Sequence, residues 1–330
     1  MKRATPLRLS VAPMMDWTDK HCRYFHRLLA PDALLYTEMV HSAAVVHGDR
    51  DRLLDNSSVT GPVALQLGGS DPAQMAEAAA IGEQYGYAQI NINVGCPSDR
   101  VQSGQFGACL MARPAVVAQC VREMRARVSV PITVKSRIGI DEQDSEEFLR
   151  DFVDQVADAG CSHFIIHARI AILAGLSPKQ NREIPPLNYP RVHRLALQRP
   201  DLDIEINGGF RDVESVTEQA GHVDGVMIGR AAYQTPYLLA SLQQALRPGE
   251  SPESGFPTRS DVMEDVIAYA AQQRAAGIPL RAVARHTLGL FQGLPGARHF
   301  RRAMSEGMHQ PDADVDVIWS ALGELESQTA

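Results

Sequence analysis

The chain has 330 residues, of which 45% are hydrophobic and 22% charged, and its formal net charge is −7. This length is enough for one large domain and a smaller one, and the composition is that of a folded protein rather than a disordered one. No apolar stretch approaches the length that spans a membrane, and the segment after Met1 lacks the apolar core of a signal peptide. A negative net charge argues against a general nucleic-acid binder.

The five cysteines argue against two further classes of protein. Their number is odd, and no two of them form a C-x-x-C pair or have the spacing of zinc ligands. This disfavours a disulfide-rich secreted protein and a structural zinc site, so we expect no metal. Such cysteine usage is typical of the reducing cytoplasm, which is the location that we predict.

In chain order, eight short apolar runs alternate with segments of helical pattern. Strand and helix repeated eight times predict an α/β fold, a (β/α)8 TIM barrel. A doubly wound parallel sheet is the alternative, but no G-x-G-x-x-G follows the first run. The strands are predicted at residues 9–14, 33–40, 62–68, 88–94, 131–138, 163–169, 203–208 and 225–229. Helices are predicted, among other places, at residues 71–85, 114–128, 145–159 and 233–246.

The segment that follows the last predicted helix of the barrel breaks regular structure. Residues 247–257 contain three prolines and two glycines, which predicts a linker. After it, four helical patterns at residues 260–276, 280–291, 297–308 and 313–326 occur without a strand. We therefore predict a catalytic barrel at residues 1–246, a linker at 247–259 and a small all-helical C-terminal domain at 260–330.

One part of the helical domain has an unusual charge. Residues 274–302, called the basic segment below, contain six arginines and two histidines and no acidic residue. Because the whole chain carries −7 and this segment +6, the remainder carries about −13. A basic surface on an acidic protein indicates a specific site for a polyanion. An ordinary solvated helix face is the alternative.

Polar residues and glycines stand near the predicted carboxyl ends of the strands, and Pro13 and Met14 stand at the end of the first. Barrel enzymes build their active sites at that end from several strands at once. Any one of these residues alone is more often structural, but their coincidence at one end of the barrel favours a site. They are Pro13, Met14, Glu38, Gln66, Asn93, Cys96, Lys135, Arg137, His167, Arg169, Asn207, Gly208, Gly209, Gly229 and Arg230.

Cys96 is the strongest candidate for a catalytic residue. It lies at the tip of a predicted strand that carries Asn91 and Asn93, two amides that are costly to bury unpaired, and a loop with three glycines surrounds it. An ordinary thiol is mostly protonated at neutral pH, so Cys96 suits a proton donor better than a nucleophile. The other four cysteines fit buried inert thiols.

The ends of the last two strands indicate a phosphate site. Glycines at 208, 209 and 229 expose backbone N–H groups, and Arg230 adds a charge. Lys135 needs an anion or an electron-rich carbonyl in the barrel mouth. A flavin meets both needs, and Gln66 and His167 can serve its ring edges. A Schiff-base lysine of the aldolase type is the alternative for Lys135, but it leaves Cys96 and Gln66 without a role.

These residues resemble the tRNA-dihydrouridine synthases, most closely their A subfamily, over nearly the whole length of the chain. The motifs that carry the resemblance are long and occur in the order of the family. They are residues 11–18 (VAPMMDWT), 65–69 (LQLGG), 91–111 (NINVGCPSDRVQSGQFGACLM), 134–141 (VKSRIGID), 167–169 (HAR), 175–187 (GLSPKQNREIPPL), 207–209 (NGG), 225–230 (GVMIGR) and 296–302 (GARHFRR).

The resemblance implies an FMN-binding barrel followed by a helical domain, with NADPH-dependent reduction of the uridine C5–C6 bond in the tRNA D-loop at position 20 and often 20a. It implies that Cys96 protonates C5 after hydride reaches C6. It implies no membrane, metal or obligate protein partner. The implied cofactor residues are Pro13, Met14, Met15, Gln66, Lys135, His167, Asn207, Gly208, Gly209, Gly229 and Arg230. The implied tRNA contacts are Asn93, Lys179, Arg182, Arg298 and Arg301.

One position departs from the family and two alternative functions stay open. Relatives usually carry an aromatic residue near position 172, where this chain has Ile172. A flavin oxidoreductase of the same barrel type acting on a small molecule is one alternative, although it would not need a basic helical domain. A tRNA-binding protein without catalysis is the other, although RNA binding alone does not call for Cys96, Lys135 and His167.

Overall fold

The computed structural model describes residues 6–247 and 256–326 and has a closed barrel of eight parallel strands. The strands follow one another around the barrel in chain order, so the predicted (β/α)8 fold is confirmed and the doubly wound alternative is wrong. They are β1 (Arg8–Val11), β2 (Leu34–His41), β3 (Val63–Gly68), β4 (Gln89–Val94), β5 (Ile132–Arg137), β6 (His163–His167), β7 (Asp203–Asn207) and β8 (Gly225–Ile228).

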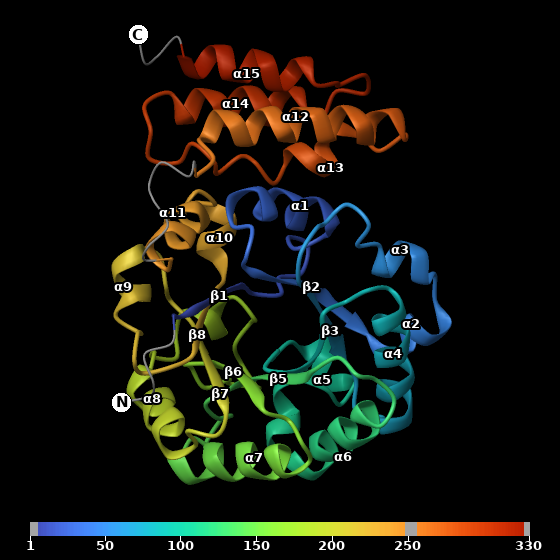
Figure 1. Cartoon of the computed structure of the whole chain (residues 1–330), viewed down its shortest axis with the longest axis vertical. Helices are drawn as coiled ribbons and strands as arrows, with labels where there is room; N and C mark the ends of the chain where they lie inside the picture. Colours follow the sequence, from blue (N-terminus) through green and yellow to red (C-terminus); the bar gives the residue numbers. More distant parts are fainter. Residues whose placement is uncertain (1–5, 248–255, 327–330) are drawn as a thin grey trace.

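Helices surround the barrel, and a further group of helices lies against one side of it (Figure 1). Those around the barrel are α1 (Lys20–Leu29), α2 (Ser42–His47), α3 (Arg50–Leu54), α4 (Pro72–Gln84), α5 (Asp99–Ser103), α6 (Pro114–Arg125), α7 (Glu146–Asp158), α8 (Tyr189–Gln198), α9 (Val213–Thr217), α10 (Arg230–Gln234) and α11 (Leu238–Ala245). The C-terminal group consists of α12 (Arg259–Ala275), α13 (Leu280–Ala284), α14 (Ala297–Gly307) and α15 (Asp316–Glu326). Two short 3-10 turns, η1 (Gly107–Ala112) and η2 (Gln180–Arg182), lie in barrel loops.

Local sequence signals explain where the longer barrel helices begin. Asp71 caps α4 by accepting a hydrogen bond from the backbone N–H of Gln74, and Pro72 occupies the first helical turn. Ser145 caps α7 in the same way, and Glu146 and Glu147 complement the helix dipole. These helices therefore begin within one residue of their predicted starts.

The barrel has a polar interior and an apolar exterior because side chains alternate along each strand. On β4, Ile90, Ile92 and Val94 pack outward into the large core beneath the helices. The interior holds only a small apolar cluster of Ala12, Tyr36, Ala64, Ile165 and Met227. Many other interior positions carry buried polar side chains that are paired, among them Ser10 with Glu205, Gln66 with Asn91, and Asn91 with Thr133.

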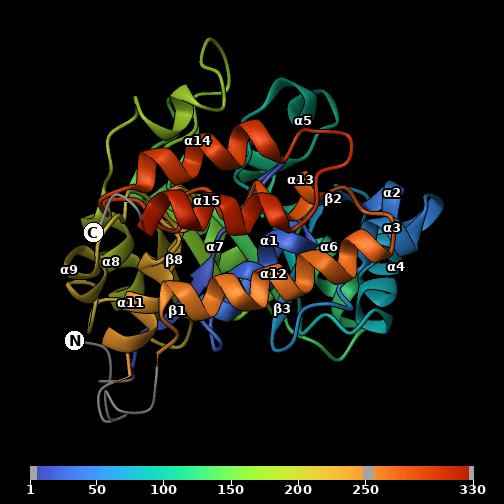
Figure 2. The same ribbon diagram turned by 90° about the horizontal axis from the view of Figure 1, so that it is seen from above.

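The C-terminal helices pack mainly on α1. Tyr269 of α12 stacks on Tyr24 of α1 with ring centroids 3.8 Å apart, and its hydroxyl is hydrogen-bonded to Nδ1 of His21 at 2.8 Å. Figure 2 shows α14 on the side nearer α5, which follows β4, and α12 farther from it. α14 therefore lies nearer than α12 to the end of the barrel where the strands terminate.

Two predicted helices are shorter than expected. The helix predicted at residues 233–246 is two helices, α10 and α11, because Pro236 supplies no N–H and cannot continue a helix. The helix predicted at residues 280–291 ends at Ala284, and turns follow as far as Gly296. The predicted linker at 247–259 falls mostly on residues 248–255, which lie outside the described residues.

Candidate active site

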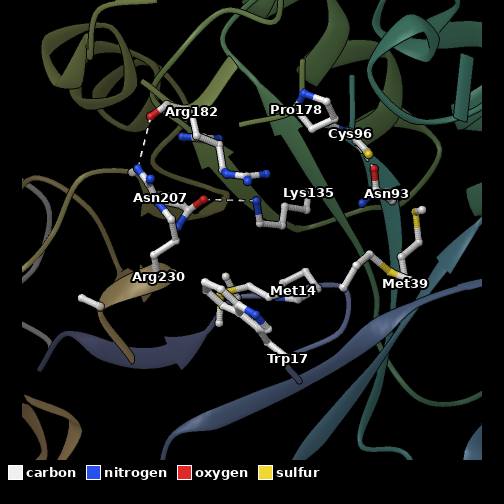
Figure 3. Close-up of a pocket in the computed structure, with 18 of the residues that line it drawn as sticks. Met14, Trp17, Met39, Asn93, Cys96, Lys135, Pro178, Arg182, Asn207 and Arg230 are labelled. Carbon is white, nitrogen blue, oxygen red and sulfur yellow. Dashed lines mark hydrogen bonds between the residues drawn. The ribbon is translucent and has the colours of Figure 1, made fainter. Parts of the chain in front are cut away.

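A cavity of about 740 Å³ opens at the carboxyl ends of the strands (Figure 3). Its size lies within the range of small-molecule and cofactor sites. All eight strands or the loops that follow them contribute to its wall. Of the residues predicted for the site, those that line it are Pro13, Met14, Met15, Gln66, Asn93, Cys96, Lys135, His167, Arg182, Asn207, Gly208, Gly209, Gly229 and Arg230.

Three residues predicted to contact tRNA do not line this cavity. Lys179 is exposed on the loop before η2, one residue after Pro178, which does line it. Arg298 and Arg301 are exposed on α14. Arg298, Arg301 and Arg302 share one face of this helix, because residues three and four apart are neighbours, while Phe300 is buried on the other face. These arginines therefore form a surface separate from the cavity wall.

Lys135 projects from β5 into the middle of the cavity (Figure 3). Its Nζ donates a hydrogen bond to Oδ1 of Asn207 at 3.1 Å. Burial, followed by the nearby positive charge of Arg137, lowers the pKa of Lys135 to about 7. The protein therefore does little to stabilise the protonated form of Lys135, and a bound anion would stabilise that form.

His167 ends β6 beside Lys135. Burial is the main cause that holds its pKa well below the ordinary value, and the charges of Arg137 and Lys135 add to it. The ring is therefore neutral at physiological pH and presents one N–H and one acceptor nitrogen. It is also close to Gly208, since a Cβ built at Gly208 would lie 2.8 Å from its Cδ2 atom.

Glycines shape the part of the wall formed by β7 and β8. Gly208 and Gly209 have φ values of +124° and +84°, which side-chain-bearing residues rarely adopt. A Cβ at Gly209 would lie 2.6 Å from Cδ1 of Leu187. A Cβ at Gly229 would meet no atom within 4 Å and would instead occupy cavity space. Glycine at these places leaves room for a ligand close to the backbone.

Asn93 fixes the loop that carries Cys96. Its Oδ1 accepts hydrogen bonds from the backbone N–H groups of Gly95 at 3.1 Å and Cys96 at 3.0 Å. The thiol of Cys96 lies 3.5 Å from Oγ of Ser98. Gly107 approaches the same loop so closely that a Cβ there would lie 2.6 Å from the carbonyl oxygen of Cys96. The thiol is therefore held at the cavity wall by a defined backbone conformation.

The two arginines predicted to share the barrel mouth differ. Arg137 lines the cavity, and its guanidinium donates to the backbone carbonyls of Gly95 at 3.1 Å and Asn181 at 3.0 Å. Arg169, which was predicted to lie near the end of the same strand as His167, does not line it. The strand ends at His167, and the guanidinium of Arg169 instead donates to the backbone of Pro185. Both arginines thereby order the long loop after β6.

Arg230 is paired on the protein. It forms an ion pair with Glu183 at 2.7 Å and donates to the carbonyl of Arg182 at 3.4 Å (Figure 3). Arg182 and Arg211 also line the cavity, so its rim is cationic. Arg211 had no role in the sequence analysis, because an arginine in a turn after a strand is a common solvated residue.

Sequence reasoning also missed two apolar wall residues, Trp17 and Met39. Trp17 stacks on Tyr233 of α10 with ring centroids 4.3 Å apart. Trp17 belongs to the motif at residues 11–18, and its place three residues after Met14 indicated that it lies near the site. Nothing in that motif predicted that it stacks on Tyr233. Met39 lies in a predicted strand, and its neighbours on β2 are displaced by a register shift after Tyr36.

The wall fits a flavin by its chemistry. A cation, Lys135, points to the centre, neutral His167 and the Gln66 amide line the same wall, and the glycines of β7 and β8 leave backbone accessible beside Arg230. Nothing in this set resembles a metal site: within residues 6–247 and 256–326, no group of three or more His, Cys, Asp or Glu side chains is arranged to hold an ion. No helix among those residues is both long and apolar enough to cross a membrane.

The fold is similar to that of a solved protein with little sequence identity to this chain. The solved structure of a 2-naphthoyl-CoA reductase in complex with 2-naphthoyl-CoA superposes with a TM-score of 0.55 at 10% sequence identity. The match covers 72% of this chain and 50% of the reductase chain. At this identity the similarity supports the barrel fold alone.

Sequence relatives are much closer. The chain is 54% identical to the tRNA-dihydrouridine(20/20a) synthase of Vibrio vulnificus (strain CMCP6) over 319 residues, which cover 96% of this chain and 97% of that protein. It is 52% identical over 327 residues to the synthase of the same name from Xanthomonas campestris pv. campestris, with coverage of 98% and 96%. It is 54% identical over 316 residues to that of Escherichia coli (strain K12), with coverage of 96% and 90%.

The model of one protein family matches almost the whole chain. That family is described as dihydrouridine synthase (Dus), and the match runs over residues 10–323. It includes the entire cavity wall, the loop of Cys96 and most of the C-terminal helices. Members of this family reduce uridine in tRNA and are generally flavin-dependent. The chain therefore belongs to the dihydrouridine synthase family.

Proposed function

We propose that this chain reduces the C5–C6 double bond of uridine to 5,6-dihydrouridine in the D-loop of tRNA, at position 20 and also at 20a. The observation that supports it most directly is one cavity wall that contains a thiol, Cys96, together with every residue predicted to hold a flavin. The relatives named above, at 52–54% identity, carry the same two positions in their names.

FMN is the proposed cofactor and NADPH the proposed reductant. Lys135 would face the electron-rich edge of the flavin ring, and Gln66 and His167 would bind its polar atoms. Pro13, Met14 and Met15 would lie against the ring, while the backbone of Asn207, Gly208, Gly209 and Gly229 and the Arg230 guanidinium would hold the phosphate. When bound, FMN would supply the hydride that C6 of uracil requires.

Cys96 would complete the reduction. Its thiol would give a proton to C5, and the resulting thiolate would regain a proton from water. The backbone bonds of Gly95 and Cys96 to Asn93 keep the thiol in place without using its sulfur. Of the two N–H groups on the Asn93 amide, one donates to Oε1 of Gln66 and the other would be available to the uracil.

The helices after residue 259 are proposed to bind tRNA, with Arg298 and Arg301 on α14 and Lys179 and Arg182 beside the cavity as contacts. RNA of this kind is bound through phosphates and shape, and the target base must leave its stack to enter the cavity. Division of the chain at residues 246 and 260 is part of this proposal, as is a cytoplasmic location. The latter agrees with the five cysteines, all of which are free.

The test is a position-resolved map of dihydrouridine in tRNA from cells that lack this gene. We expect loss confined to positions 20 and 20a, restored by the wild-type gene and not by Cys96→Ala. Cys120→Ala, at a buried cysteine on α6 that does not line the cavity, is the matched control and should restore both positions. An unchanged map would overturn the proposal and favour a small-molecule substrate.

A further inference from the structure

We propose that Thr133 and Asn91, which do not line the cavity, are positioning residues that fix which atom of the Gln66 amide faces the flavin. The inference rests on the proposed function for the identity of the cofactor. It concerns a buried row of side chains inside the barrel that links the loop of Cys96 to the interior beneath the cavity.

The row follows the strand register. Gln66 on β3 pairs with Asn91 on β4, and Asn91 pairs with Thr133 on β5, so the three side chains lie next to one another in the barrel interior. All three are buried, with exposed fractions of 1% or less. Asn93 lies two residues above Asn91 on the same strand and therefore faces the same side.

Hydrogen bonds join these side chains into one chain. Asn93 Nδ2 donates to Gln66 Oε1 at 2.8 Å, Gln66 Nε2 donates to Asn91 Oδ1 at 2.8 Å, and Asn91 Nδ2 donates to Thr133 Oγ1 at 2.9 Å. Thr133 Oγ1 also accepts from Gln89 Nε2 at 3.1 Å. Its own hydrogen points to the carbonyl of Ile90 at 3.5 Å.

The direction of this chain is fixed from one end by the backbone. An amide oxygen and nitrogen have the same shape, so the orientation of Asn or Gln follows only from its partners. The N–H groups of Gly95 and Cys96 can only donate, so the atom of Asn93 that faces them must be oxygen. Each later amide then has a single orientation that pairs a donor with an acceptor.

The other end is fixed by Thr133. Its hydroxyl accepts from both Asn91 and Gln89 and donates to the carbonyl of Ile90. A reversed Asn91 would place a nitrogen against the Nε2 of Gln66 and would draw the hydroxyl hydrogen of Thr133 away from Ile90. An unpaired buried polar group costs about 1–3 kcal/mol. Reversal of Gln66 therefore requires reversal of the whole row or an unpaired group in the barrel interior.

The consequence reaches the cavity at Gln66. Its oxygen is used by Asn93 and one N–H by Asn91, which leaves one N–H for the ligand. Gln66 thus presents a donor, and the cofactor atom that it meets must be an acceptor. Asn93 also accepts from the backbone of the Cys96 loop, so one hydrogen-bond network fixes both the Gln66 donor and the position of the Cys96 thiol.

The test compares Thr133→Val, which keeps the shape but removes the hydroxyl, with Thr133→Ser, which keeps the hydroxyl. We expect Thr133→Val to weaken FMN binding to the apoprotein about tenfold and to shift the visible absorption bands of the bound flavin, because Asn91 Nδ2 loses its acceptor and the row no longer holds Gln66 firmly in the orientation that Asn93 sets. Thr133→Ser should match the wild type in both measurements. If Thr133→Val does not fold, Asn91→Asp replaces the donor to Thr133 with an acceptor oxygen and should weaken FMN binding in the same direction.

Thr287→Val is the matched control for loss of a buried threonine hydroxyl. Thr287 is fully buried in the turns that follow α13, and its hydroxyl donates to the carbonyl of Ala284. This variant should lower thermal stability without changing FMN affinity or the flavin spectrum. Wild-type FMN affinity and spectrum in Thr133→Val, or an equal change in Thr287→Val, would overturn the inference alone. A wild-type chain that binds no FMN would instead overturn the proposed function and the inference with it.

Discussion

Arg285 of the basic segment bonds to Asp19 of the barrel, with Nη2 2.5 Å from Oδ2. The other side of the same guanidinium donates to the carbonyl of Asp16 at 2.9 Å. Asp19 also accepts from His286 and caps α1 through the N–H groups of His21 and Cys22. Hydrogen bonds from His286 and the other donors hold the pKa of the Asp19 carboxyl well below its usual range, against the effect of burial.

This bond ties one arginine of the basic segment to the barrel, although its side chain stays 38% exposed. The loop that it holds, residues 14–17, forms part of the cavity wall. We therefore expect Arg285→Met to weaken FMN binding severalfold and to lower the unfolding free energy by about 1–2 kcal/mol, as for loss of a hydrogen-bonded charge. Titration of the apoprotein with FMN and thermal unfolding measure the two effects.

Arg281→Met is the control for that change. Arg281 lies one helical turn away on α13 and is exposed, and it has no hydrogen bond or ion pair to the loop of Asp16. This variant should keep wild-type FMN affinity and stability. Equal FMN affinity in Arg285→Met and Arg281→Met would contradict a bracing role for Arg285.

The stability of the chain should fall as the pH drops below about 6.5 because of a buried neutral histidine. Burial lowers the pKa of His26 to about 3, although a hydrogen bond to the backbone of Ala232 raises it. Between the two pKa values the unfolded state binds the extra proton, so folding stability decreases as pH falls through this window. From pH 7.5 to pH 5 the loss is about 2 kcal/mol for this one group.

Urea unfolding at the two pH values measures this loss in the wild type and in His26→Gln. The variant should be less stable overall but less dependent on pH. His47→Gln, at an exposed histidine on α2, should keep the wild-type dependence. If His26→Gln and the wild type lose the same free energy between pH 7.5 and pH 5, the neutral buried state of His26 is wrong.

The sequence predicts the barrel well because its signals are local. Each strand is a short apolar run and each long helix has a cap or a proline at its start, so the eight strands lie within a few residues of their predicted places. The helix predicted at 233–246 is wrong because the apolar pattern continues through Pro236. The prediction followed the hydrophobic pattern and gave too little weight to Pro236, the one residue that ends the helix.

The candidate site is predicted less completely, for a different reason. Residues at strand ends, such as Cys96 and Lys135, converge by the geometry of the fold, so their place in the cavity follows from the strand count. Contacts between segments that are distant in the sequence do not follow from the fold type in this way. The stacking of Trp17 on Tyr233 and the bond from Arg285 to Asp19 depend on how the C-terminal helices pack on α1, which no local pattern describes.

FMN affinity should fall as pH rises above 7 because Lys135 loses its proton. In the apoprotein its pKa is lowered to about 7, so at pH 8.5 most molecules carry a neutral amine. A flavin edge that needs a cation must then bind together with a proton, which costs about tenfold in affinity for each pH unit above that pKa. We expect FMN to bind at least tenfold more weakly at pH 8.5 than at pH 7.

Lys135→Met separates this effect from titration of the FMN phosphate. The variant should bind FMN more weakly at pH 7, and its affinity should no longer fall between pH 7 and pH 8.5. Arg8→Met, at the opposite end of the barrel where Arg8 pairs with Asp203, is a control that keeps the lysine and should keep the pH dependence. A decline in Lys135→Met as steep as in the wild type would exclude Lys135 as the titrating group.

Substitution of the α14 arginines should affect tRNA and not the cavity. Arg298 and Arg301 are exposed, and neither lines the cavity. We expect Arg298→Ala with Arg301→Ala to raise the KM for tRNA about tenfold and to leave NADPH oxidation by the free enzyme unchanged. Because each phosphate contact contributes about 0.7–0.9 to the slope of log affinity against log salt, the slope should fall by roughly 1.5.

Arg122→Ala with Arg150→Ala is the matched double variant. Both arginines are exposed, on α6 and α7, which lie across the barrel from the C-terminal helices in Figure 1. It removes the same charge, so a change caused only by net charge would appear in both variants. An equal rise in KM in both double variants would mean that the α14 arginines make no specific contact with tRNA. A rise in the α14 double variant alone would identify this helix as part of the contact. Loss of NADPH oxidation as well would mean that the α14 substitutions disturb the packing around Phe300 instead.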